Sequence, residues 1–158
     1  METKIKSYFF KSCLIGGLVL SVFSCKKEKE EPGPGGTTSD TITRFQLALD
    51  APKGKLDAVA FFTDPNGISN QTAVTSVTVD ANTIYTGTLT LEDESKTPKA
   101  TVTKNYTVSY RITGIDATIT GGATPTLTTK STGDGTLNVT LTKADKSKSI
   151  AFPITVRQ

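Results

Sequence analysis

The feature that most constrains the fold is an alternation of apolar and polar residues that recurs through residues 41–158. The run 137–141 (LNVTL) shows it most cleanly, and the same period of two returns in segments 44–49, 85–91 and 150–156. Alternate side chains of a β-strand point to opposite faces, so this period indicates strands with one buried face. Threonine and other β-branched residues, which favour strands, are frequent. No segment carries an apolar stripe of period 3.6 long enough for a helix, so the pattern predicts an all-β domain.

Polar turn sequences separate these runs. Asp64–Gly67 (DPNG) combines a proline that presets φ with a glycine free to take φ > 0, and Asp80–Asn82 and Ala144–Lys148 (ADKSK) are further predicted turns. Pro153, inside the last run, predicts an edge strand. Short strands at this spacing indicate a sandwich or a small barrel. We predict an antiparallel, immunoglobulin-like β-sandwich of about seven or eight strands over residues 41–158. The chain has no tryptophan, which excludes an antibody-type core.

Residues 1–24 have the pattern of a secretory signal peptide. Lys4, Lys6 and Lys11 supply positive charge, and Cys13–Phe23 (CLIGGLVLSVF) is an uncharged apolar stretch. That stretch is shorter than the roughly 18–20 apolar residues that a membrane-spanning helix needs. We therefore expect a cleaved signal rather than the alternative, a retained signal anchor.

The apolar stretch ends in Val22-Phe23-Ser24-Cys25, which resembles a bacterial lipobox. In that motif the cysteine sulfur is acylated and the chain is cut just before the cysteine. Cys13 leaves with the signal, so Cys25 would be the single thiol of the mature chain, and acylation explains an unpaired cysteine in an exported protein. We predict a covalent lipid on Cys25, no other cofactor, and stable membrane attachment by more than one acyl chain.

Residues 25–40 (CKKEKEEPGPGGTTSD) continue with charges, then proline and glycine, then small polar residues. Such a composition cannot bury apolar area, which predicts a disordered tether. The Lys/Glu run Lys27–Glu31 resembles the surface-export signal of Bacteroidota lipoproteins, although simple solvation explains it equally well. The expected location is the outer membrane, lipid-anchored, with the periplasmic and outer faces both left open.

Two further segments are distinctive: 81–95 (ANTIYTGTLTLEDES) and 131–141 (STGDGTLNVTL). Together they are similar to a group of small Bacteroidota lipoproteins that share "NTxYxGxLxLxxES" followed by "GxGxLxVxL". The resemblance implies a small outer-membrane lipoprotein. Some members carry a type 1 periplasmic-binding fold label, which the strand pattern here does not support. Members follow the ES loop with an acidic stretch ending near Glu-His. Residues 99–106 contain neither acidic residue nor histidine, so no ligand or metal role carries over to them.

Composition excludes several kinds of chemistry. The chain has no histidine, which removes the commonest general base and the commonest transition-metal ligand. The pairs Ser95–Lys96 and Ser147–Lys148 fall in predicted turns, where solvated neighbours explain them better than an activated nucleophile. Residues 41–158 carry twelve basic and ten acidic side chains, so no charge excess favours nucleic acid. We predict a protein that is neither an enzyme nor a nucleic-acid binder.

The remaining candidates are polar loops, because binding residues concentrate on loops held by rigid sheets. The loops chosen are Asp64–Gly67, Glu92–Pro98 and Ser131–Gly135, and their candidate partner-binding residues are Asp64, Asn66, Glu92, Asp93, Glu94 and Asp134. Replacing the three acidic residues 92–94 together is expected to weaken partner binding without lowering the thermal midpoint.

A calcium site and a sugar-binding platform are the two alternatives to plain loop binding. Asp64, Asn66, Asp80, Asn82 and Asp134 could contribute to a calcium site, but none has the spacing of a known calcium loop, so we predict no metal. Tyr106 and Tyr110 share one strand face and could form a sugar platform, yet their apolar neighbours favour core packing.

Two functions fit these inferences. The first is a non-catalytic, membrane-anchored lipoprotein that presents a β-sandwich binding or adhesion module at the cell envelope. The alternative is an accessory capture lipoprotein that partners an outer-membrane transporter of the TonB-dependent type. In both cases we expect the sandwich domain to be monomeric.

Overall fold

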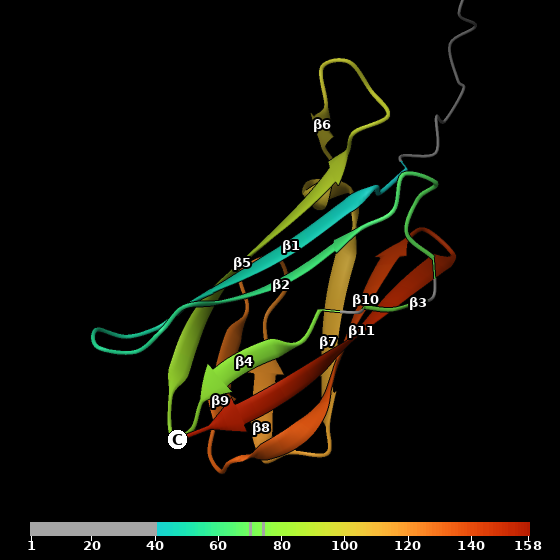
Figure 1. The fold of residues 1–158 in the computed structure, drawn as a ribbon. Coiled ribbons are helices and arrows are strands. Elements are labelled where there is room, and N and C mark those ends of the chain that lie inside the picture. The colour runs from blue at the N-terminus through green and yellow to red at the C-terminus, as the bar shows by residue number, and fades with distance from the viewer. Residues whose placement is uncertain (1–40, 70, 74) are drawn as a thin grey trace, which may run out of the picture. The chain divides into compact units, whose positions relative to one another are not determined.

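The computed structural model describes residues 41–69, 71–73 and 75–158. The predicted signal peptide, Cys25 and the tether lie outside the described residues. Within them the fold is all-β, with eleven strands in two sheets and a single short 3₁₀ turn, η1 (Thr103–Asn105) (Figure 1). The all-β prediction is therefore confirmed.

The first sheet has six strands, and all of its pairs are antiparallel. Its order is β2 (Ala58–Thr63), β1 (Arg44–Asp50), β5 (Ile84–Asp93), β9 (Thr126–Thr129) and β8 (Ala117–Thr120), and β6 (Ala100–Thr101) pairs with the end of β5. Strand β5 is the centre of this sheet, because β1, β9 and β6 all pair with it.

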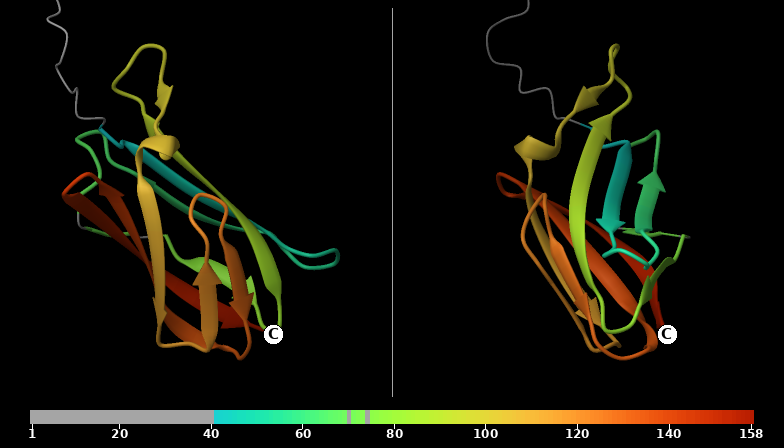
Figure 2. Two further views of the ribbon diagram at one scale, coloured as in Figure 1. Left: turned by 180° about the vertical axis from the view of Figure 1, so that it is seen from behind. Right: turned by 90° about the vertical axis from the view of Figure 1, so that its left-hand side faces the viewer.

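The second sheet has five strands and packs face to face with the first (Figure 2). Its order is β3 (Gln71–Thr72), β11 (Lys146–Arg157), β10 (Gly133–Lys143) and β7 (Thr107–Thr113), and β4 (Val77–Asp80) also pairs with β11. Strands β3 and β4 run parallel to β11, so this sheet is mixed and not purely antiparallel as predicted.

Seven of the strands follow the immunoglobulin order. The path β1-β5-β9-β8 corresponds to strands A-B-E-D, and β11-β10-β7 corresponds to G-F-C. Strands β2, β3, β4 and β6 are additions, which is why the structure has eleven strands and not about seven or eight. Three of the additions have only two to four residues, too few for a period of two to stand out in the sequence.

The core lies between the sheets and is built from the alternating apolar positions. Phe45 and Phe152 meet across it, with ring centroids 5.1 Å apart. The largest fully buried side chains are Tyr85, Phe45, Phe152, Ile42, Leu47, Leu49, Ile68, Leu91, Leu127, Leu137, Leu141 and Ile150. Each such side chain stabilises the fold by roughly 1.5–3 kcal/mol relative to an exposed one.

Pro153 was expected to mark an edge strand, and this prediction is wrong. Strand β11 lies between β10 on one side and β3 and β4 on the other. The proline is tolerated because β3 pairs only with residues 150–151 and β4 only with residues 154–157. Pro153 faces the gap between these two short strands, so its missing N–H interrupts neither ladder.

The end of the sandwich at which the described chain begins, here the entry end, bears on function (Figure 1). The backbone N–H of Thr41 donates to Asp93 Oδ2 at 3.2 Å, beside the end of β5. Thr142, near the end of β10, pairs with Thr107 at the start of β7. The entry end therefore carries loops 64–69 and 94–106 and the β10–β11 turn, residues 144–145. The opposite, far end carries loops 51–57, 81–83 and 130–132 and the C-terminus.

Candidate functional site

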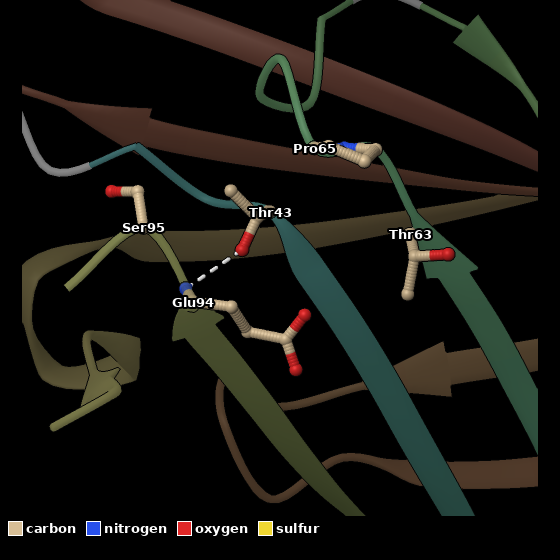
Figure 3. A pocket seen from close by; sticks show the side chains of 5 residues that line it. All are labelled: Thr43, Thr63, Pro65, Glu94 and Ser95. Atoms are coloured by element: carbon tan, nitrogen blue, oxygen red, sulfur yellow. Dashed lines mark hydrogen bonds between the residues drawn. The ribbon is translucent and has the colours of Figure 1, made fainter. Parts of the chain in front are cut away.

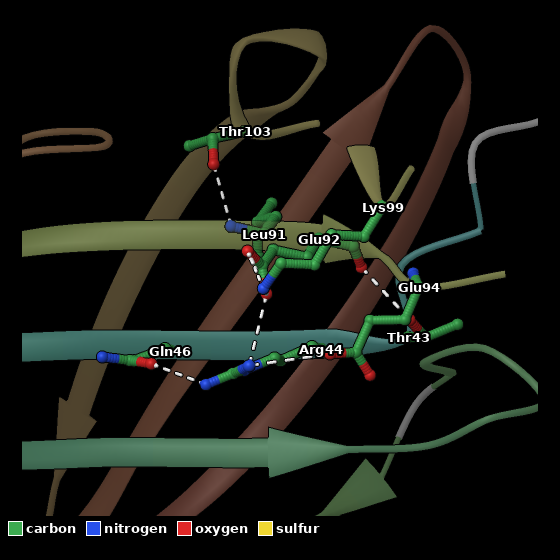
Figure 4. A network of polar contacts seen from close by, with 8 residues as sticks. All are labelled: Thr43, Arg44, Gln46, Leu91, Glu92, Glu94, Lys99 and Thr103. Atoms are coloured by element: carbon green, nitrogen blue, oxygen red, sulfur yellow. Dashed lines mark hydrogen bonds and ion pairs between the residues drawn. The ribbon is translucent and has the colours of Figure 1, made fainter. Parts of the chain in front are cut away.

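A network of ion pairs joins β1 to the end of β5 on the outer face of the first sheet (Figure 4). The Arg44 guanidinium lies 3.5 Å from Glu92 and 3.6 Å from Glu94, and Lys99 Nζ lies 3.1 Å from Glu92. Arg44 also sits 5.3 Å from the centre of the Phe61 ring. Glu92 and Glu94 thus share one side of the strand, as the alternation predicts. Glu92 is partly buried in this network, and Arg44, which it holds, in turn holds the more exposed Glu94 carboxylate in place.

Asp93 lies on the opposite side of the same strand and is 1% exposed. Its carboxylate accepts hydrogen bonds from the Thr41 backbone, the Ser95 backbone and the Ser95 hydroxyl, and Lys96 Nζ lies 3.4 Å from it. These contacts, the Ser95 hydroxyl first, hold the pKa of Asp93 below its ordinary value despite burial. Asp93 therefore holds the backbones of Thr41 and Ser95, and its burial argues against direct contact with a partner.

The DPNG turn forms as predicted. The Gly67 N–H donates to the Asp64 carbonyl at 2.9 Å, with Gly67 at φ +94°. The Asp64 carboxylate accepts from the Asn66 N–H at 2.9 Å and from Gln71 Nε2 at 3.1 Å. The Gln71 contact is the main cause of the lowered pKa of Asp64. The Asp64 carboxylate is thus bonded within the protein, whereas Pro65 and Asn66 of the same turn are exposed.

A small pocket of about 180 Å³, open to solvent, brings two of the predicted loops together (Figure 3). Its lining residues are Thr43, Thr63, Pro65, Glu94 and Ser95. Thr43 organises it: its hydroxyl accepts from the Glu94 N–H at 2.8 Å and donates to the Glu92 carbonyl at 3.3 Å. The Glu94 side chain remains 43% exposed at the rim. The hydroxyls of Thr43 and Ser95 are already bonded within the protein, so the carboxylate of Glu94 is the charged group that the rim presents, and it suits a partner group that donates hydrogen bonds or carries positive charge.

Asp134 lies away from this pocket. It was predicted in a loop, but it is the second residue of β10, near the far end, and accepts a hydrogen bond from the Thr155 hydroxyl at 2.7 Å on the neighbouring strand. The glycines on either side are not loop residues either. Gly133 and Gly135 both belong to β10.

No group of three or more His, Cys, Asp or Glu side chains is placed to hold a metal ion within residues 41–69, 71–73 and 75–158. Asp80, one of the carboxylates considered for calcium, is 7% exposed and engaged by Arg157 at 3.2 Å and Lys55 at 3.8 Å.

The two tyrosines pack against the core, which confirms that prediction. The Tyr110 hydroxyl donates to the Gly122 carbonyl at 2.8 Å and so links β7 to the β8–β9 loop. Burial raises the pKa of Tyr110 above its ordinary value. Lys143 Nζ lies 5.7 Å from the centre of the Tyr106 ring, a cation–π contact that covers this ring.

The segment 81–95, one of the two distinctive segments of the sequence, owes many of its residues to the fold. Asn82 turns the chain at φ +51°, and the fully buried Tyr85 accepts a hydrogen bond from the Asp80 N–H at 2.8 Å. A Cβ at Gly87 would lie 2.7 Å from the Pro125 ring, so only glycine fits there without a shift. These positions are structural and identify no ligand.

The second segment, 131–141, is also structural. Leu137, Val139 and Leu141 are fully buried in β10. A Cβ at Gly135 would collide with the Thr113 carbonyl on β7. The segment 131–141 therefore reflects how β10 packs. Glu94 and Ser95, at the end of the segment 81–95, line the pocket, and the other three lining residues lie outside both segments.

Sequence reasoning missed Thr43, Thr63, Pro65 and the two cations Arg44 and Lys99. Alternation alone places Arg44 on the outer face of its strand, but nothing local shows that Glu92 is its cross-strand neighbour. Register between strands distant in sequence is the information that was lacking.

No helix among the described residues is long and apolar enough to cross a membrane. Comparisons with family models, with curated proteins and with solved structures find no match to this chain.

Proposed function

We propose that this protein is a lipid-anchored lipoprotein of the outer membrane that presents its sandwich as a non-catalytic binding or adhesion module. The anchor would be an acylated Cys25, supported by the small-residue-then-cysteine seam after a short apolar stretch. The described residues from Thr41 onward have a hydrophobic core of their own, which supports a rigid domain carried on a tether.

The observation that carries a binding role is the Glu94 carboxylate at the pocket rim. Its backbone is fixed by Thr43 and its side chain by Arg44, so little conformational freedom would be lost on binding. A preorganised carboxylate at the rim of a small pocket favours a partner that presents a basic or hydroxyl-bearing group to it.

The place of the pocket supports the capture alternative as well. It lies at the entry end, close to Thr41, where the chain leaves the tether. A partner in the same membrane, such as an outer-membrane transporter, would be within reach of this end. The identity of the captured partner separates the two functions: a transporter favours substrate capture, and an extracellular or envelope polymer favours adhesion.

The experiment is a pull-down from gently solubilised outer membranes with wild type and Glu94→Ser. The variant should lose most of the captured partner. Its free energy of unfolding should stay within about 0.5 kcal/mol of wild type, the range of an ordinary surface substitution. Asp145→Asn, another exposed carboxylate of the entry end that does not line the pocket, is the matched control and should capture normally. Equal capture by wild type and Glu94→Ser would exclude the pocket.

A further inference from the structure

The β10–β11 hairpin gathers three lysines on one face. Lys143 is the cross-strand partner of Lys146, and Lys148 is the partner of the buried Leu141. Side chains paired across strands share a face, as do residues two apart along a strand. The three lysines therefore lie on the same face of the hairpin as the buried Leu141, but closer to the turn, where the hydrophobic core has ended.

Lys146 and Lys148 concentrate positive charge near the tip of the hairpin. Lys146 lies directly opposite Lys143, whose ammonium group rests over the Tyr106 ring. Asp145 is the single carboxylate between residues 142 and 149. Within the described residues, no ion pair joins Lys146 or Lys148 to a carboxylate. An anionic surface would complement the charges of Lys146 and Lys148.

The hairpin tip lies at the entry end, beside the loop that carries Tyr106 (Figure 1). The chain between Cys25 and this end is only residues 26–40. Each basic side chain near an anionic leaflet strengthens binding about fivefold. A short tether also holds the domain at high local concentration, so a patch too weak to bind alone can dock once anchored.

We propose that the face formed by Lys143, Lys146 and Lys148 binds anionic lipid headgroups of the membrane to which the chain is anchored. The inference rests on the proposed lipid anchor and deepens it, because it assigns the entry end to the membrane side. The far end then faces outward, and the Glu94 pocket lies within reach of a partner in the same membrane, which favours the capture alternative.

The test uses the mature chain from Cys25 onward, whose single thiol can be coupled to a maleimide lipid. Vesicles contain phosphatidylcholine with or without phosphatidylglycerol, and lysine acetylation is read by mass spectrometry. We expect labelling of Lys146 and Lys148 to fall several-fold on phosphatidylglycerol vesicles only, and to recover at high salt. Lys53 and Lys130, at the far end, serve as internal controls and should label equally on both.

Lys146→Glu sharpens the test. It replaces a like-charge pair by an opposite one, so protection of Lys148 should be lost while the thermal midpoint is maintained or raised. Lys53→Glu makes the same charge change at the far end and should keep protection. If both variants lose it equally, net charge alone acts and the proposed face is wrong.

Equal labelling of Lys146 and Lys148 on both kinds of vesicle would also overturn the proposal, and is the result expected if the hairpin binds an acidic protein. Because the coupling is chemical, this outcome is independent of whether cells acylate Cys25. The vesicle experiment can therefore disprove the lysine face without bearing on the lipid anchor, which is tested by acylation in cells.

Discussion

At the residue scale, the main finding is that neighbouring acidic side chains have different roles. Glu92 and Glu94 lie on the surface, whereas Asp93 between them is buried and holds the Thr41 and Ser95 backbones. Replacing all three together would confuse partner binding with folding. The expectation that such a triple change leaves the thermal midpoint unaltered no longer follows, and Glu94 has to be tested alone.

Asp93→Asn should destabilise the domain by about 1–3 kcal/mol at neutral pH, because an amide donor would face groups that now donate to a carboxylate. The pKa of Asp93 is lowered from 3.8, so its charged form stabilises the fold fully above about pH 4. That contribution is lost as the pH falls through the folded-state pKa. The gap in stability between wild type and variant should therefore narrow on acidification.

Chemical denaturation from neutral to acidic pH measures this gap. Asp145→Asn, an exposed turn carboxylate, is the control and should stay within about 0.5 kcal/mol of wild type. A gap that is constant at every pH would show that Asp93 does not act through its charge.

At the element scale, β5 organises the first sheet, since it meets three strands and also the β8–β9 loop. The Gly87 N–H donates to the Pro125 carbonyl at 2.6 Å, and the Leu89 N–H donates to the Ala123 carbonyl at 2.7 Å. The loop can approach this closely only because residue 87 has no side chain.

Gly87→Ala should therefore cost about 1–3 kcal/mol, the range for forcing extra atoms into a packed region. Gly122→Ala, in the same β8–β9 loop, is the matched control: no atom lies within 4 Å of its added Cβ and its φ is not positive. That variant should be neutral or slightly stabilising. Urea unfolding of both variants decides the matter, and equal midpoints would argue against a steric role for Gly87.

At the scale of the whole molecule, the folding of the domain and its proposed attachment depend on different parts of the chain. The sandwich carries its own core from Ile42 to Val156. The proposed attachment to the envelope depends on residues before Thr41, and it rests on Cys25, which would be the single cysteine of the mature chain.

Cys25→Ala should abolish acylation and leave precursor with its signal uncut, because the thiolate is the nucleophile that takes up the lipid. Metabolic labelling with a palmitate analogue, followed by immunoprecipitation, measures this. Ser24→Ala, which keeps a small residue before the cysteine, should label like wild type. Label retained on the Cys25 variant would remove the lipoprotein assignment.

The sequence by itself determined what depends on local geometry. A period of two fixes which side chains share a face, so the core positions of β1, β5, β10 and β11 followed from the pattern. The DPNG turn followed for the same reason, because the preferences of proline and glycine act within four residues.

Only the tertiary structure decided what depends on pairing between distant segments. Asp93 looks solvated in its local sequence, yet it is buried by Thr41, 52 residues away. Pro153 suggested an edge, but two short parallel strands flank its position. The pocket and the lysine-bearing hairpin lie at the entry end, and Asp134 lies near the far end, because strand order and register determine where each loop is placed. Both are set by long-range contacts that leave no local periodic signal.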